Sequence, residues 1–519
     1  MSDTELGKQQ LWASRFKKGT NPIGKQYSES VTVDRNMFYQ DIWGSEAHSI
    51  MLGYTGIIKE DHSRKILEAL QKIKKDFSEG TWDLGMAEED VHMNVERFVI
   101  DTVGIENGGR MHTCRSRNDQ VVLDTKLYSR DKLLEVKKSL SKVIKALLDR
   151  SKEDTTAIMP GYTHTQHAQP MTVAYWFTHY AAIFLRDLER LSASYKVTDT
   201  NPLGAGALTG TSFPIDRKLT TRLLGFEKVQ EHCLDAVTAR DYNLQTISSL
   251  AILFSTLSRI AEEVIYGITH EFRTMVLDDS LAMGSSMMPQ KKNPGVLELV
   301  RGRTGKMYGI LMAMLTTIKG LPSGYNRDYH EDKTTLVEAL ALANETLQVI
   351  QCVIETIKIN KDRTKELVNQ NFAAATELAN YLVRDHNIPF RLCHRIVGYV
   401  VGELVEEGKN FTDYKRTQEL LADKDIVINE ADLDRVLNPE QVIEKYNSLG
   451  GTSPVEVERM IEAMYSELSD QSHHIADIDN RIDTARNETA EIVRLVLDGG
   501  SLKEAVNSVL RKKEELASV

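Results

Sequence analysis

The stretch AVTARDYNLQTISSLAILFSTLSRIAEEVIYGITHEF (residues 236–272) contains no proline and repeats apolar residues at the spacing of an α-helix. These apolar residues are Leu244, Ile247, Ala251, Phe254, Leu257, Ala261, Val264 and Ile268. A helix of this length is stable only when its apolar face is buried. The stretch therefore predicts one member of a helical bundle.

The distribution of proline extends this prediction to the rest of the chain. Residues 215–288 and 323–388 contain no proline, and a proline inside a helix costs roughly 3 kcal/mol. Three further segments show helical spacing: 172–191, 296–318 and 334–359. The alternation typical of strands is scarce. The sequence thus predicts an all-α chain with a central bundle of long helices.

Composition limits the class of protein. The chain has 519 residues, a formal net charge of −11, 41% hydrophobic and 27% charged residues, which predicts roughly two to four globular domains. The acidic balance argues against nucleic acid as a partner. The most apolar run, 250–257, is soon followed by Arg259, Glu262 and Glu263, so we expect no membrane span. The first ten residues, MSDTELGKQQ, lack the apolar segment of a secretory signal.

The four cysteines are far apart in the sequence. Cys114, Cys233, Cys352 and Cys393 form no close pair, which argues against a disulfide framework and against zinc-ligand spacing. We therefore expect a protein of the reducing cytoplasm without a bound metal.

Four polar or glycine-rich loops separate the predicted helices. They are HTCRSRNDQ (112–120), PGYTHTQHAQP (160–170), NPLGAGALTGTSFPID (201–216) and GSSMMPQKKNP (284–294). The third consists mostly of small residues and is interpreted as a packing turn with no catalytic role. The other three concentrate Arg, Asn, Ser, Thr, His and Lys, and such loops on rigid helices are favourable places for functional sites. The alternative is that they are solvated polar turns.

A resemblance to a known family favours functional sites. GSSMMPQKKNP resembles the signature loop of the fumarase/aspartase superfamily of lyases, and its core, residues 290–293, resembles the argininosuccinate lyase branch more than the fumarase branch. The first two loops resemble segments of that branch and fall in the family's order. So do GSEAH (44–48), LPSGYNRDYHEDK (321–333) and ATELANYLVRDHNIPFR (375–391). The resemblance covers the chain from about Leu11 to Val457.

The resemblance implies an architecture. Members of the family are homotetramers with a central bundle of long helices, and their active sites combine loops from three subunits. We accordingly expect an N-terminal helical domain (1–113), a central bundle domain with the signature loop (114–362) and a C-terminal helical domain (363–519). The segment beyond about Ser466 is longer than the family leads us to expect. Its spacing predicts an amphipathic helical tail that could pack between subunits.

The resemblance also implies a reaction without a cofactor on a small-molecule substrate. In this superfamily a base removes a proton next to a carboxylate, a C–N or C–O bond breaks, and fumarate leaves. Ser285 would be the base, held as an oxyanion by backbone N–H groups and nearby positive charge. Gly284 would permit a tight backbone, Lys291 and Asn293 would bind the dianion, and Ser286 would be structural or a secondary donor.

His164 is the second predicted centre. By resemblance it pairs with Glu298 and protonates the leaving group. A lone histidine is more often structural, but the Thr-His pair between two prolines favours a site. The carboxylates of the fumarate half would be held by Thr163, Ser116, Arg117 and Asn118, although Arg117 alone could be a surface ion-pair residue.

The amine half of the site contains most of the departures from the family. The matching positions are Ser30, Asp34, Arg240, Tyr325, His330 and Lys333. His330 stands where the branch usually has Gln, Ala239 and Gly295 replace acidic residues, and Cys114 replaces Gly. Because a Gln at the His330 position is expected to help bind the arginine end, His330 could suit a different amine.

Three functions remain open at this point. The first is cleavage of argininosuccinate to arginine and fumarate, and the second is a C–N lyase of the same branch acting on another N-substituted aspartate. The third is a structural, crystallin-like protein, which nothing in the residues favours because Ser285, His164, Lys291 and Asn293 are all present. GRTGKMYG (302–309) lacks the Walker spacing and lies in a helical stretch, so a nucleotide site is rejected.

Overall fold

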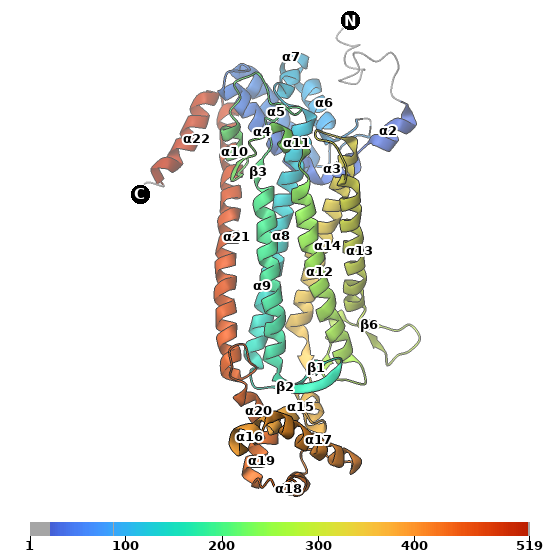
Figure 1. Cartoon of the computed structure of the whole chain (residues 1–519). Coiled ribbons are helices and arrows are strands. Elements are labelled where there is room, and N and C mark those ends of the chain that lie inside the picture. The colour runs from blue at the N-terminus through green and yellow to red at the C-terminus, as the bar shows by residue number, and fades with distance from the viewer. Residues whose placement is uncertain (1–20, 87, 517–519) are drawn as a thin grey trace.

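The computed structural model describes residues 21–86 and 88–516, with side chains as far as Arg511. Leu11, where the resemblance begins, and the segment MSDTELGKQQ lie outside the described residues. The chain is elongated: long helices form a central bundle, the N-terminal helices cover one end, and a small helical group stands at the other (Figure 1). In the text below, the end with the N-terminal helices is the upper end.

Five long helices form the bundle, and they confirm the predicted all-helical architecture. They are α8 (Arg117–Glu153), α9 (Val173–Thr198), α12 (Asp241–Ile268), α13 (Gly295–Ile318) and α14 (His330–Thr356). Helix α8 packs on α9 and α14, and α12 packs on α9 and α13. Each of the four stretches with helical spacing forms most of one helix. The apolar spacing in 236–272 is realised as a buried stripe that includes Leu250, Phe254 and Leu257.

Helix α8 was not predicted, although it is the longest of the five at 37 residues. It begins in the polar loop 112–120, where the Ser116 side chain accepts the backbone N–H of Asn118 and the Asp119 side chain accepts the N–H of Ser116. This capping box satisfies N–H groups that the first turn leaves free. Helix α8 is buried on several sides, because it packs on α4, α9, α14 and α21.

The N-terminal helices pack onto the upper end of the bundle and share its hydrophobic core. They are α2 (Pro22–Ser28), α3 (Val31–Asp34), η2 (Arg35–Met37), α4 (Phe38–Tyr54), α5 (Glu60–Ser78), α6 (Val91–Val103), α7 (Ile105–Gly108) and η3 (Gly109–His112). Of these, α4 makes the main contact with α8.

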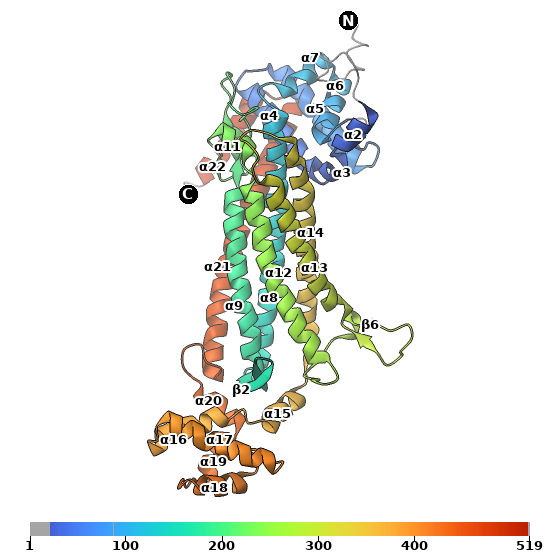
Figure 2. The same ribbon diagram turned by 45° about the vertical axis from the view of Figure 1, so that its right-hand side comes forward.

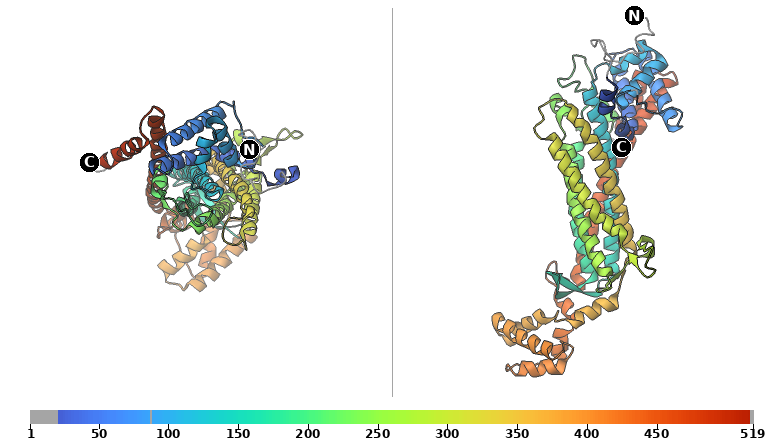
Figure 3. Two further views of the ribbon diagram at one scale, coloured as in Figure 1. Left: turned by 90° about the horizontal axis from the view of Figure 1, so that it is seen from above. Right: turned by 90° about the vertical axis from the view of Figure 1, so that its right-hand side faces the viewer.

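The helices at the opposite end are set off from the bundle (Figure 3, right). They are α15 (Lys361–Gln370), α16 (Ala375–His386), α17 (Phe390–Glu406), α18 (Tyr414–Ala422), α19 (Glu430–Leu437) and α20 (Pro439–Lys445). Helices α16–α20 enclose a hydrophobic core of their own, which includes Leu378, Val400 and Leu433. The division of the chain at residues 113 and 362 stays a prediction.

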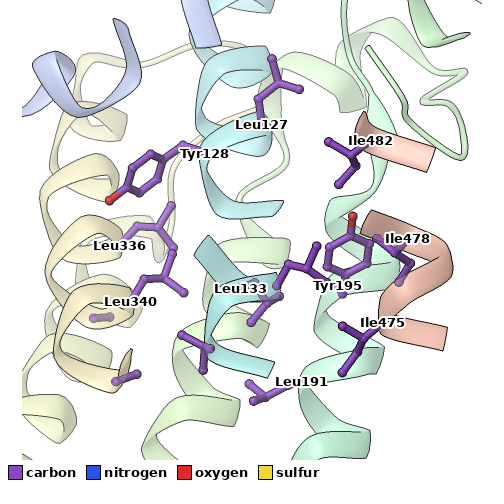
Figure 4. Packing of buried hydrophobic residues seen from close by; sticks show 14 of the residues in the cluster. Leu127, Tyr128, Leu133, Leu191, Tyr195, Leu336, Leu340, Ile475, Ile478 and Ile482 are labelled. Carbon is purple, nitrogen blue, oxygen red and sulfur yellow. The ribbon is translucent and has the colours of Figure 1, made fainter. Parts of the chain in front are cut away.

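The C-terminal tail is helical, as predicted, and returns along the whole bundle. It consists of α21 (Pro454–Leu497), with 44 residues, and α22 (Leu502–Leu516). Ile475, Ile478 and Ile482 of α21 point towards Leu133 of α8 and Tyr195 of α9 (Figure 4). Helix α22 packs on α4. The tail therefore packs within its own chain, and a role between subunits stays a prediction.

Short strands occur in the connections between helices. The antiparallel pairs are β1 (Ile158–Thr163) with β2 (Gln166–Thr172), β5 (Met275–Val276) with β8 (Lys358–Ile359), and β6 (Met283–Gly284) with β7 (Lys292–Asn293); β3 (Thr200–Asn201) and β4 (Lys228–Val229) pair in parallel. The remaining elements are α10 (Arg217–Leu223), α11 (Cys233–Thr238), η4 (Asp279–Leu281) and η5 (Arg327–Tyr329). The predicted loop 160–170 is thus a β-hairpin, and the signature loop projects from the bundle on the stem β6–β7 (Figure 2).

Two segments, Asp241–Ile268 and Arg327–Thr356, are long and apolar enough by length and composition to cross a membrane. Their most apolar windows are 61% and 50% buried inside the chain. The core helices of a soluble bundle pass the same test, and α12 and α14 belong to this bundle. The absence of a membrane partner stays a prediction.

Candidate active site

The predicted site residues fall into three separate groups within one chain. The upper cluster lies where the N-terminal helices meet the bundle and contains Ser30, Asp34, Ser116, Arg117, Asn118, Arg240, Tyr325, His330 and Lys333. The hairpin tip contains Thr163 and His164 at the opposite end of the bundle. The signature loop, residues 284–294, carries Ser285, Lys291 and Asn293 and leads into Glu298 (Figures 1 and 2).

Ser30, Asp34 and Lys333 form a buried polar network in the upper cluster. The Lys333 ammonium forms an ion pair with Asp34 and lies 3.2 Å from Ser30 Oγ, and Ser30 Oγ donates to Asp34 Oδ2 at 2.7 Å. All three side chains are buried. This network joins residues about 300 positions apart in the sequence. It fixes the Lys333 ammonium in place, and the pairing with Asp34 avoids an isolated buried charge.

Arg240, also in the upper cluster, is buried and fixed by an acidic partner and an aromatic ring. Its guanidinium forms an ion pair with Asp332 and lies 4.3 Å from the centre of the Tyr329 ring. Burial acts to lower the pKa of Arg240, but the charge of Asp332 outweighs it and the pKa is raised. Arg240 Nη1 also donates to the backbone oxygen of Ala239 at 2.9 Å. Ala239, a departure from the family, therefore contributes through its backbone.

Tyr325 and His330 lie beside these charges. Burial raises the pKa of Tyr325 to about 12. Burial, together with the positive charges of Lys333 and Arg327, lowers the pKa of His330 to about 4. At neutral pH His330 is therefore an uncharged imidazole that can donate one hydrogen bond and accept another.

Ser116, Arg117 and Asn118 occupy the start of α8. A helix N-terminus favours anions, because its free N–H groups and dipole point outward. Arg117 Nη1 pairs with Asp90 at 2.8 Å, and Asn118 Nδ2 donates to the backbone oxygen of Ala207 at 3.1 Å. The first turn thus combines a guanidinium, an amide and a capping hydroxyl, which suits recognition of a carboxylate.

The loop 201–216 packs against the start of α8, which agrees with its interpretation as a packing turn. Asp119 Oδ2 accepts the backbone N–H groups of Gly204 at 3.0 Å and Gly206 at 2.8 Å. Burial raises the pKa of Asp119 to about 6. Asp119 therefore ties this loop to the first turn of α8, next to Asn118.

The hairpin tip presents His164 in an unusual backbone conformation. Tyr162 pairs with His167 and Thr163 with Gln166, so the turn consists of His164 and Thr165, with φ angles of 53° and 56°. Two consecutive left-handed residues are typical of the tight turn between antiparallel strands, where Asn and Gly are usually found. The fold therefore maintains an unfavourable conformation that leaves His164 exposed at the tip, as is common at functional sites.

Ser285 lies on the signature loop, where two backbone N–H groups point at its hydroxyl oxygen. Its Oγ accepts the backbone N–H groups of Met288 at 3.0 Å and Met287 at 3.3 Å. Two N–H donors on one hydroxyl oxygen stabilise negative charge on that oxygen. Asn293 lies across the stem, with its Nδ2 at 3.5 Å from the backbone oxygen of Gly284. Lys291 is exposed on the same loop.

The backbone at Gly284 corrects one of the interpretations, and the structure also describes the surroundings of Gly295 and Cys114. Gly284 has no positive φ, and a Cβ there would meet open space, so a tight backbone is not its reason within this chain. A Cβ at Gly295 would collide with the Met283 side chain, so a larger residue there would require that flexible side chain to move. Cys114 has φ 65°, a conformation natural to the glycine that it replaces.

The three groups cannot form one site within a single chain. Helix α13 has 24 residues and separates the signature loop from Tyr325 by about 36 Å, and α9 with 26 residues separates the hairpin from the upper end by about 39 Å. His164 and Glu298 are both exposed, and no ion pair joins them within the part of the chain described here. Their predicted pair would have to form between chains.

Two large hollows open elsewhere on the chain. One of about 1860 Å³ lies between α21 and residues 215–231, and one of about 1250 Å³ adjoins the β1–β2 hairpin. Thr163 of the hairpin tip lines the second hollow, whereas Arg117, His164 and Ser285 line neither. Most of the predicted site residues therefore lie outside both hollows.

Comparison with known proteins places the chain in a family. A family described as lyase matches residues 14–309, and one described as argininosuccinate lyase C-terminal matches residues 372–444. The chain is 40% identical to an argininosuccinate lyase of Bacillus velezensis and 42% identical to one of Symbiobacterium thermophilum. Each alignment covers 87% of this chain and 97% of the relative. The chain belongs to the argininosuccinate lyase family.

Solved structures agree with membership of the argininosuccinate lyase family. The structure of an EDDS lyase in complex with formate is similar with a TM-score of 0.81 and 26% identity, covering 93% of this chain and 97% of that one. A class II fumarase of Schistosoma mansoni has a TM-score of 0.68 at 16% identity over 86% of this chain and 96% of its own, which shows the fold alone. The predicted fumarase/aspartase-like fold is confirmed.

The sequence analysis missed the acidic partners of two arginines in the upper cluster. Asp90 pairs with Arg117, and Asp332 pairs with Arg240. Asp332 stands within the segment LPSGYNRDYHEDK that was already singled out, whereas Asp90 lies outside every such segment. A signal existed, because a buried cation requires a buried anion, but spacing along the chain does not reveal which pairs meet.

Proposed function

We propose that the protein is an argininosuccinate lyase, which cleaves a C–N bond of argininosuccinate by β-elimination and releases L-arginine and fumarate. The identity of 40–43% to curated argininosuccinate lyases over 97% of their length supports this substrate. The observation that carries the chemistry is Ser285 Oγ, which accepts two backbone N–H groups on the signature loop.

Ser285 acts as the base in this proposal. A neutral hydroxyl is a poor base, so the oxygen that takes the substrate proton must first be held as an oxyanion. The N–H groups of Met287 and Met288 provide that stabilisation at 3.3 and 3.0 Å. Proton removal produces a carbanion whose charge spreads into the neighbouring carboxylate, and Lys291 and Asn293 on the same loop bind the resulting dianion.

His164 acts at the leaving group. Its exposed position at the tip of a rigid two-residue turn lets the imidazole reach into a site formed with other loops. Glu298 of another chain orients it and favours its charged form, so that it donates a proton to the departing amine. Thr163 beside it binds a substrate carboxylate.

The upper cluster binds both ends of the substrate. Ser116, Arg117 and Asn118 at the start of α8 hold the carboxylates of the fumarate half. The amine half contacts the remaining residues of the cluster, which are Ser30, Asp34, Arg240, Tyr325, His330 and Lys333. His330 is neutral at pH 7, since its pKa is about 4, so it contributes a hydrogen bond and no repulsion to a cationic guanidinium.

A homotetramer with shared sites completes the proposal. The upper cluster lies about 36 Å from the signature loop of its own chain, so a second chain must supply that loop. Helix α13 supports such an association, because Leu299, Tyr308, Met312 and Leu315 are exposed on it. A Cβ placed on any of its glycines 302, 305 and 309 would have no neighbouring atom within 4 Å, which leaves room for close approach of another helix.

The cellular setting is proposed from the cysteines. All four are free, and free thiols are typical of the reducing cytoplasm. We infer cytoplasmic action on a soluble, small-molecule substrate.

A second candidate function is elimination from another N-substituted aspartate. One observation favours it: His330 replaces the usual Gln of the branch. Both candidates share the same base, acid and fumarate half, so they differ in the amine alone.

Incubation of the purified protein with argininosuccinate tests the proposal. Fumarate is followed by its ultraviolet absorbance, and arginine is measured by chromatography in equal amount. The matched control is Ser285→Ala, which should form neither product. If the parent protein forms no fumarate from argininosuccinate but does so from another N-substituted aspartate, the second candidate replaces the first.

A further inference from the structure

A buried cluster of three titratable side chains lies beneath the upper cluster and has no part in the proposed chemistry. Asp41 of α4, His92 of α6 and Asp124 of α8 meet there, and none is more than 5% exposed. One side-chain nitrogen or oxygen atom from each residue lies within 4.8 Å of the other two. The cluster therefore joins the three helices that support the substrate-binding end of the bundle.

The contacts within the cluster are unevenly distributed. His92 Nδ1 lies 2.8 Å from Asp41 Oδ1 and 3.3 Å from Asp124 Oδ2. Gln120 Nε2 donates to the same Asp41 oxygen at 2.6 Å. In contrast, Asp41 Oδ2 and both oxygens of Asp124 receive no hydrogen bond from the residues that the structure describes. Asp41 thus has two donors, while Asp124 has none.

Two ionised carboxylates in this position would be strongly unfavourable. A buried polar atom normally has a partner, and an unpaired buried charge loses its hydration without compensation. One imidazole cannot neutralise two carboxylates. A proton on Asp124 resolves the conflict, because the carboxylic acid is neutral and can donate to an Asp41 oxygen that has no other donor.

The surrounding groups also favour a proton on Asp124 rather than on Asp41. Burial, the negative charge of Asp41 and a hydrogen bond with Asp41 raise the pKa of Asp124 well above its usual range, and Asp34 adds to this while Arg115 opposes it. Burial acts to raise the pKa of Asp41, but the hydrogen bond and charge of His92, with Arg115 and Gln120, lower it. Asp41 is therefore the anion of the pair and Asp124 the acid.

The cluster connects directly to residues that hold the substrate in the proposed function. His92 stands two positions after Asp90, which caps α6 and pairs with Arg117 at 2.8 Å. Gln120 and Asp124 belong to the helix whose first turn carries Arg117 and Asn118. A shift in how α6 meets α8 would therefore move Arg117, and a displacement of about 1 Å in a binding group can change rates by roughly a hundredfold.

We propose that Asp124 is a neutral carboxylic acid whose O–H donates a hydrogen bond to Asp41, and that the Asp41–His92–Asp124 cluster positions the first turn of α8 and Asp90 for substrate. The positioning role rests on the proposed function, whereas the protonation of Asp124 does not.

A matched pair of substitutions tests the proposal. Asp124→Asn replaces a neutral acid by a neutral amide that can donate the same hydrogen bond. We expect kcat/KM for argininosuccinate within about threefold of the parent. Asp41→Asn removes the anion that receives His92 and Gln120, and we expect a fall in kcat/KM of roughly a hundredfold, mainly through KM. A purely structural role would lower the melting temperature and leave KM unchanged.

Melting temperature against pH provides a readout that does not depend on activity. The folded chain holds the Asp124 proton more firmly than the unfolded chain, so the stability from this proton is complete below the ordinary carboxyl pKa. That stability is lost as the pH rises through the raised value. Asp124→Asn should therefore lose less stability than the parent at alkaline pH. If Asp41→Asn does not assemble, Gln120→Met removes one donor to the same oxygen, and KM should rise by about tenfold.

Several results would overturn the proposal. If Asp124→Asn is as damaging as Asp41→Asn, Asp124 is ionised in the native protein. One equivalent of divalent metal in the purified protein, lost in both variants, would mean that a cation occupies the cluster. An unchanged KM in every variant would remove the positioning role. If the parent makes no fumarate from argininosuccinate, the proposed function fails, while the melting curves still decide the protonation of Asp124.

Discussion

Mixing two inactive variants tests whether the site is shared between chains. Arg117→Ala damages the upper cluster, and Ser285→Ala removes the proposed base. Arg117 belongs to the upper cluster, which the 24-residue helix α13 separates from the signature loop of Ser285 by about 36 Å, so one site cannot take both from one chain. Each variant alone should form a folded but inactive oligomer.

The expected recovery follows from counting sites. When the two variants are mixed in equal amounts and assembled at random, a site receives an intact Arg117 with probability one half and an intact Ser285 with probability one half. About a quarter of the sites are then complete in a symmetric oligomer. The mixture should therefore regain about a quarter of the parent's fumarate production, measured after joint unfolding and refolding or after co-expression.

A second mixture provides the control. Parent chains mixed with a chain carrying both substitutions should also retain about a quarter of full activity if the site is shared, but about half if it lies within one chain. His164→Asn with Ser285→Ala should likewise regain about a quarter if the hairpin and the signature loop come from different chains. The reasoning is refuted if the Arg117→Ala and Ser285→Ala mixture stays inactive although native mass spectrometry shows mixed oligomers.

Three further predictions concern single residues. Ser285→Ala should lower turnover by roughly a thousandfold or more without changing the melting temperature, and turnover within about tenfold of the parent would exclude Ser285 as the base. His330→Gln should keep or improve kcat/KM for argininosuccinate, because it restores the family's residue; a loss on argininosuccinate would favour a different amine. Lys137→Met should raise the melting temperature at pH 7 by roughly 2 °C. Burial lowers the pKa of Lys137 to about 8, so the folded chain holds this proton less firmly than the unfolded one, and stability is reduced below about pH 8 and rises above it. The control is Lys126→Met. Burial also lowers the pKa of Lys126, to about 7, but Lys126 Nζ donates to Thr200 and to Gln230 at 2.6–3.2 Å, and loss of these hydrogen bonds should lower the melting temperature. Equal losses in both variants would contradict the argument.

The sequence alone was sufficient to predict the bundle. Helices α9, α12, α13 and α14 form where apolar residues recur at helical spacing without proline. This pattern is local, and it places the apolar residues on one face of a helix that can be buried. Helix α8 escaped prediction because it is rich in charge. Several of its charged side chains, including Lys126 and Arg130, are buried by neighbours distant in sequence.

The motifs were also recognisable, but their arrangement was not. The residues of the signature loop, the Thr-His pair and the Ser-Arg-Asn run could be named from the sequence because each lies within a short segment. The turn at His164 and Thr165 could not be foreseen. Left-handed φ angles at two such residues are maintained by the pairing of the surrounding strands and not by the residues themselves.

Tertiary structure decided which of these residues meet. Ser30 and Asp34 reach Lys333 across some 300 residues, and the glycine-rich loop 201–216 closes on Asp119. Tertiary structure also set the three groups at opposite ends of the bundle, which the motifs did not indicate. The physical reason is that helical periodicity depends on neighbours three and four positions apart. The pairing of buried charges depends on how whole helices pack, and that information is spread over the entire chain.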